Sequence, residues 1–171
     1  TSQLPAAAKV SEVQRIWSAS PLIAPESLRV AVNQGAGGWS DVLSVTITSI
    51  VFTKRVSSCE TDCEYEANVA WSVGQSPTPC GKLPRGSQAQ PGVGAVPDEF
   101  FREGSVLSVR STLPYQPYLI GTSSLLGTVG RTLTATMSEG SWFLPRNAPR
   151  IVLSAGGASS PRATFCPGFT S

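Results

Sequence analysis

The side chains in this sequence that could do chemistry are its carboxylates, its serines and its four cysteines. The sequence has no histidine, which removes the commonest general base and excludes Ser/His and Cys/His nucleophile pairs. It has no GxSxG or SxxK motif to activate a serine, and no Asp-rich calcium loop. Glu64 and Glu66 lie on the polar face of an expected strand, where we interpret them as solvated surface. We therefore predict no catalytic residue, no metal ligand, no cofactor and no enzymatic activity.

The cysteines are the remaining candidates, and they point to disulfides. Their spacing lacks the two CxxC knuckles of an all-cysteine zinc site. Two disulfides are predicted instead, which places the chain in an oxidising compartment. Because such a protein must be exported, we expect a segment before Thr1 that is cleaved in maturation or lies outside this sequence. Three pairings are open from the residues alone, among Cys59, Cys63, Cys80 and Cys166.

The composition is that of one domain with few charges. A chain of 171 residues can bury one proper core and is short for two. Charged residues make up 14% of it and the net charge is +2, with the cations scattered along the chain. This balance argues against binding to nucleic acid and against electrostatic docking on a membrane. The sequence also has no apolar stretch of the roughly 20 residues that a membrane span requires.

The clearest structural signal is a predicted hairpin over residues 42–73. Its first half is β-branched and apolar, and its second half alternates strictly between apolar and polar residues. We therefore expect two strands joined by a polar turn that carries Cys59 and Cys63. The alternation predicts one apolar face that presents Trp71 to the core. That face consists of Tyr65, Ala67, Val69, Trp71 and Val73.

The other elements follow from weaker patterns. A helix is predicted over residues 5–17, because apolar residues share one helical face at Ala6, Val10, Val13 and Trp17. This helix either lies on the sheet or forms the end of a longer amino-terminal helix. Residues 98–104 are expected to form a short helical turn or a tight loop, with Phe100 and Phe101 pointing inward. Further strands are predicted at residues 28–33, 105–113, 131–137 and 151–153.

Together these patterns predict an α+β fold over residues 1–171, in which an amino-terminal helix packs on a mainly antiparallel sheet of about five strands. We expect a single domain with three parts: a helix and linker at 1–26, a β-rich body at 27–155, and a loose tail at 156–171. Within the body, residues 74–97 hold five prolines and five glycines and are expected to form a long loop without regular structure.

Three segments carry a resemblance to a known family. The first is SSCETDCEYEANVAWSVG followed by PC, over residues 57–80. The second begins at LPYQPYLIG and ends at TLTATMSEGSWFLPRNAP, over residues 113–149. The third is the order of an Ala-rich helix, a Pro-rich link and VAVNQG. In these segments the chain resembles the TadE/TadG-like proteins, which are minor pilins or pseudopilins of the tight-adherence (Tad/Flp, type IVc) pilus system.

The resemblance implies a pilin-like domain of the periplasm or cell surface, anchored in the inner membrane before assembly by an amino-terminal helix missing from this sequence. The implied role is non-catalytic, in pilus assembly, priming or tip formation and so in surface attachment. The implied partners are other pilus subunits or assembly proteins, and no nucleic acid.

The residues also favour one disulfide pairing and one contact surface. Cys59 and Cys63 flank a three-residue turn, within the reach of a disulfide, so we expect the other bond to join Cys80 to Cys166. Trp142 and Phe143 are expected to pack in the core. For the apolar connection at 115–127, two interpretations are open: core packing and partner contact. Its candidate contact residues are Tyr115, Tyr118, Leu119, Ile120, Leu125 and Leu126.

Two other functions are open. The alternative to a pilus component is a secreted or pilus-tip adhesive module that recognises a surface glycan or protein through residues 74–97 and 115–127. The third is a secreted enzyme, which a pocket lined by Glu64 and Glu66, or by Asp98 and Glu99, would favour.

Overall fold

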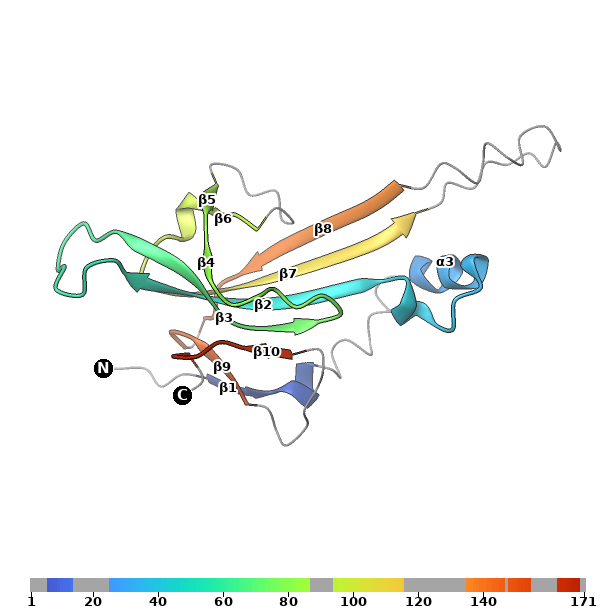
Figure 1. Cartoon of the computed structure of the whole chain (residues 1–171), viewed down its shortest axis with the longest axis horizontal. Helices are drawn as coiled ribbons and strands as arrows, with labels where there is room; N and C mark the ends of the chain where they lie inside the picture. Colours follow the sequence, from blue (N-terminus) through green and yellow to red (C-terminus); the bar gives the residue numbers. More distant parts are fainter. Residues whose placement is uncertain are drawn as a thin grey trace.

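The protein is mainly β in the computed structural model, and one curled antiparallel sheet organises it (Figure 1). The main strands follow the order β10-β3-β2-β7-β8, and a short strand, β4, pairs with β3. Within the part of the chain that the structure describes, no helix is long and apolar enough to cross a lipid bilayer. The structure describes residues 6–13, 25–86, 94–115, 135–146, 148–154 and 163–169.

The predicted hairpin forms the centre of this sheet. β2 (Ser44–Lys54) and β3 (Tyr65–Gly74) pair antiparallel, and the turn between them carries the expected cysteines. β-branched residues dominate β2, where they pack well on a pleated surface. An exposed ion pair between Arg55 and Glu64, with 3.0 Å between nitrogen and oxygen, lies at the end of the hairpin next to the turn.

A second long hairpin extends the sheet on the other side of β2. β7 (Gly104–Tyr115) pairs antiparallel with β2, and β8 (Ala135–Phe143) pairs antiparallel with β7. The strand predicted at 105–113 is therefore confirmed. β8 begins inside the strand predicted at 131–137 and continues six residues beyond it. Residues 131–134 lie outside the described residues.

The face predicted for β3 is wrong beyond Val69, because the strand contains a β-bulge. Ile50 of β2 pairs with Val69 and Ser49 pairs with Trp71, so Ala70 has no partner of its own. An extra residue reverses the alternation. Ala67 accordingly packs in one buried cluster, whereas Trp71 packs in another on the opposite face.

The helix predicted over residues 5–17 is wrong for its first part. Ala6–Lys9 is not helical but forms strand β1, which pairs parallel with β9 (Ile151–Ser154). The backbone hydrogen bonds of this pairing outweigh the helix preference of alanine, which is a weak bias when tertiary partners are present. Residues 10–13 are helical, and residues 14–17 lie outside the described residues.

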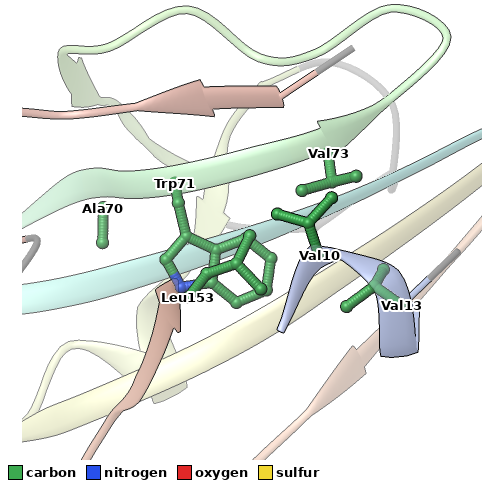
Figure 2. Close-up of a cluster of buried hydrophobic side chains, with 6 residues drawn as sticks. All are labelled: Val10, Val13, Ala70, Trp71, Val73 and Leu153. Carbon is green, nitrogen blue, oxygen red and sulfur yellow. The ribbon is translucent and has the colours of Figure 1, made fainter. Parts of the chain in front are cut away.

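The short helical turn nevertheless covers the sheet. Val10 and Val13 pack against Trp71, Val73 and Leu153, as Figure 2 shows. Trp71 is 3% exposed, and its indole Nε1–H donates a 2.8 Å hydrogen bond to the carbonyl oxygen of Ile151. The prediction that Trp71 faces the core is confirmed, and this bond ties the main sheet to the β1–β9 pair.

The strand predicted at 28–33 is wrong, because this segment forms helix α3 (Glu26–Gln34). The alternating residues Leu28 and Val32 are 47% and 79% exposed, whereas Ser27, Val30 and Ala31 are buried, and this spacing of three and four is helical. The helix ends at Gly35, whose φ of 64° is a left-handed conformation that glycine adopts without strain.

The loop predicted at 74–97 contains short strands. β4 (Lys82–Leu83) pairs with β3, while β5 (Arg85–Gly86) and β6 (Val96–Pro97) pair with each other. Val96 is fully buried and its amide donates to the carbonyl oxygen of Pro84. Residues 87–93 lie outside the described residues.

A second buried cluster lies under this segment, on the face of the sheet opposite Trp71. Phe100 and Phe101 pack against it from a 3-10 turn (Asp98–Phe100) and the residue that follows, as predicted. The Phe52 and Phe101 rings lie edge to face with 5.3 Å between centroids, and the guanidinium of Arg85 stacks 4.1 Å from the Phe101 centroid. The cluster consists of Ile50, Phe52, Ala67, Val96 and Val106.

The carboxyl-terminal segment is not a loose tail throughout. β10 (Ala163–Phe165) pairs antiparallel with β3 at the edge of the main sheet. The Cys80–Cys166 and Cys59–Cys63 disulfides are both present, which confirms the predicted pairing. Cys166 is 2% exposed and donates its amide to the carbonyl oxygen of Ala70. The long-range disulfide thus holds β10 beside the bulge.

The two disulfides should differ in their contribution to stability. Cys80 and Cys166 are 86 residues apart, whereas Cys59 and Cys63 are 4 apart. In the chain-entropy model, removing the first bond costs roughly 4.5 kcal/mol and removing the second roughly 2 kcal/mol. Urea unfolding of the Cys80→Ala/Cys166→Ala and Cys59→Ala/Cys63→Ala variants measures both. A larger loss in the second variant would contradict the model.

Gly74 is expected to tolerate no side chain. A Cβ at this position would lie 2.7 Å from the Cα of Thr46 and closer still to the carbonyl oxygen of Val45, both on the neighbouring strand. Gly74→Ala should therefore reduce the free energy of unfolding by about 1–3 kcal/mol. Gly38→Ala is the matched control, because its Cβ would lie 4.0 Å from the nearest atom and should cost less than about 0.5 kcal/mol. Equal unfolding midpoints in urea would refute this contact.

Candidate functional site

The carboxylates singled out in the sequence do not form a site. Glu64 pairs with Arg55, and Glu66 pairs with Lys82 of β4, with 2.6 Å between nitrogen and oxygen. Asp98 and Glu99 are exposed on the 3-10 turn. Among the described residues, no group of three or more His, Cys, Asp or Glu side chains could hold a metal ion. The two paired glutamates therefore support strand pairing at the sheet surface.

Of the predicted partner-contact residues, Tyr115 alone belongs to a described element. Tyr115 ends β7, and its side chain is outside what the structure describes. The other five lie outside the described residues. These five are Tyr118, Leu119, Ile120, Leu125 and Leu126. The contact role of all six residues stays a prediction.

The described residues offer another contact surface, at the outer edge of β8. β8 is the last strand of the sheet order and pairs only with β7 among the described residues. Its nine residues contain no proline and a single charge, at Glu139. Natural proteins protect a free edge of this length with charges, prolines, bulges or a covering element. Within the described part of the chain, β8 has little such protection.

Apolar side chains are exposed along the same edge. Met137 and Phe143 are 58% and 53% exposed, and Leu144 just after the strand is 46% exposed. The prediction that Phe143 packs in the core is therefore wrong. Trp142 points to the opposite face and packs against the second cluster, as predicted. Met137 and Phe143 share one face because they are six residues apart in a strand.

A groove accompanies this edge. It has a volume of about 560 Å³ and lies over β7 and β8, beside Leu43, which directly precedes β2. Its apolar lining is Leu43, Leu113 and Met137. Polar atoms of Ser111 and Glu139 also line it. A free strand edge beside an apolar groove has the arrangement that strand-addition complexes use, in which main-chain hydrogen bonds provide affinity and pockets provide specificity.

A second, smaller feature lies on the opposite face of the sheet. It is a depression of about 30 Å³, lined by four hydroxyl residues from β2, β7 and the segment after β3, together with Trp142 of β8 and small or apolar residues such as Ile50 and Leu83. Arg110 is the one charged residue among the described lining residues. Thr48 Oγ1 lies 2.9 Å from both Ser72 Oγ and Thr78 Oγ1. The depression can therefore hold one small polar group.

Sequence reasoning missed both surfaces. The alternation of Thr46 and Thr48 with Val45 and Ile47 was a signal for a polar stripe on one face of β2. The β8 edge left no comparable signal, because the sequence does not reveal which strand ends a sheet.

Comparison of the chain with protein-family models, with curated proteins and with solved structures found no match. The resemblance to the TadE/TadG-like proteins therefore stays a prediction.

The exposed side chains of β8 should contribute little to folding. Changing Met137 and Phe143 together to lysine should alter the free energy of unfolding by less than about 0.5 kcal/mol, because both side chains are already more than half exposed. The same variant should bind less of a fluorescent apolar dye in the native state. Unfolding in urea and dye titration provide the two measurements. A loss of several kcal/mol would show that these side chains are buried.

Proposed function

We propose that this chain is a non-catalytic, minor pilin- or pseudopilin-like component of a Tad-type pilus. In this proposal it acts in pilus assembly, priming or tip formation, and so in surface attachment. Its partners are other pilus subunits or assembly proteins. The proposal draws on the family resemblance of residues 57–80 and 113–149, and on a described surface suited to protein contact.

The single observation that best supports an assembly role is the edge of β8. Among the described residues β8 pairs on one side only and displays Met137 and Phe143. Such a strand favours association with another polypeptide, because strand addition would pair its second edge and cover its apolar side chains. The groove bordered by Leu43 and Leu113 would accept apolar side chains of an added strand.

The proposed location is the periplasm, and the cell surface once the pilus is assembled. Two disulfides are in keeping with an oxidising compartment. The membrane-anchoring helix that the resemblance implies would lie upstream of β1. It would not continue through Ala6–Lys9, because these residues are a strand.

Deletion of the gene tests the proposal directly. We expect loss of surface pili and of the attachment that they support, counted by electron microscopy and by a surface-binding assay. The wild-type gene should restore both. A Met137→Lys/Phe143→Lys gene should not, because the two lysines would oppose strand addition at β8.

The matched control is Val32→Lys, which changes a 79% exposed residue on α3, outside the β8 surface. This variant should restore piliation as wild type does. Normal piliation in the deletion strain would overturn the proposed function. Full rescue by the double lysine variant would show that the β8 edge plays no part in the proposed function.

A further inference from the structure

The hydroxyl-lined depression on the sheet is built from two neighbouring rows of residues. In one row, Thr46 of β2 pairs with Arg110 of β7, and Arg110 pairs with Gly140 of β8. Paired residues in antiparallel strands project to the same face. Gly140 has no side chain, so the β8 side of Arg110 is left open.

The next row lies beside the first. Thr48 of β2 pairs with Ser108 of β7, and Ser108 pairs with Trp142 of β8. Ser108 and Trp142 both line the depression. The indole Nε1–H of Trp142 is buried and has no hydrogen-bond partner among the described residues.

The hydroxyl groups are linked in a chain that starts from a backbone amide. The amide of Thr78 donates to Ser72 Oγ over 2.9 Å, and Ser72 Oγ lies 2.9 Å from Thr48 Oγ1. Thr48 Oγ1 lies 2.9 Å from Thr78 Oγ1. The Ser72 hydroxyl donates to the carbonyl oxygen of Ile47 over 3.4 Å, so Thr48 donates to Ser72 and Thr78 donates to Thr48. The Thr78 oxygen then has a lone pair left to accept a hydrogen bond from a ligand.

Arg110 adds the positive charge. It is half-buried, and it has no ion pair or hydrogen bond within the described ranges. No carboxylate is among the described lining residues either. A guanidinium presents its N–H donors in a planar fork that matches a carboxylate bidentately. The depression therefore offers donors and one positive charge to whatever enters it.

We propose that this depression binds the carboxylate of an acidic sugar in a glycan. One guanidinium neutralises a monoanion, and a space of about 30 Å³ accommodates one small group, so the carboxylate enters while the sugar ring stays at the rim. There the ring contacts the indole of Trp142, and its hydroxyl groups meet those of Thr78 and Ser108. This site does not depend on the proposed role in the pilus.

Titration of the isotope-labelled chain with trigalacturonate tests the site by NMR. We expect saturable shifts of the indole N–H signal of Trp142 and of the guanidinium N–H signal of Arg110. Arg110→Gln should weaken binding at least tenfold, and Arg110→Lys severalfold, because lysine keeps the charge but loses the fork. Thr78→Val should also weaken binding severalfold. The matched control is Arg102→Gln, an exposed arginine outside the depression, which should bind within twofold of wild type.

Further ligands separate the sugar from a general anion. Neutral maltotriose should not shift these signals, and inorganic phosphate should bind at least tenfold more weakly than trigalacturonate. Absence of trigalacturonate binding, or equal binding by phosphate, would overturn the proposal. So would wild-type affinity in Arg110→Gln. If Arg110→Gln fails to fold, the single variants Arg110→Lys and Thr78→Val replace it. Wild-type affinity in both of them would overturn the proposal.

Discussion

The bulge at Ala70 is the constraint on which the arrangement of the chain depends. It turns Trp71 away from the face that holds Ala67, so the sheet has a buried cluster on each side instead of one apolar and one solvated face. Trp71 then binds the carbonyl of Ile151, which fixes the β1–β9 pair against the sheet. The same site receives β10, whose following Cys166 donates its amide to Ala70. The first and the last described strands are therefore both attached to β3, β1 through its partner β9 and β10 directly.

Within the described part of the chain, this arrangement covers each face of the sheet only in part. The elements attached through Trp71 cover one face near β3, and the side chains of β8 on that face, Met137 and Phe143, are left exposed. The segment with Val96 and the aromatic turn covers the other face near Phe52. Beyond that cover, the second face is polar, with Thr48 and its neighbours in place of apolar residues. The two candidate surfaces thus lie on opposite faces of the sheet, each beside the part of that face that described elements cover.

The sequence was informative where local pattern and tertiary environment agree. The central hairpin and β7 were predictable because β-branched alternation and burial point the same way, and the disulfide pairing followed from the short turn at Cys59 and Cys63. α3 was missed because Leu28, Val30 and Val32 alternate by chance, while burial follows Val30 and Ala31. β1 was missed because its partner lies some 145 residues away in β9. The bulge and the site around Arg110 require strand register, which no local pattern encodes.

Arg110 differs from the paired charges of the sheet. Glu66 on β3 is matched by Lys82 across the pair, and the hairpin end is closed by Arg55 and Glu64. Such exposed pairs are worth little, but each of these four charges has a partner of opposite sign. Arg110 is half-buried between Thr46 and Gly140 and has no such partner in the described structure. Partly desolvating a cation costs free energy that the fold does not recover from any described contact. A ligand carboxylate would supply the missing charge and acceptors, which accounts for an arginine at this position.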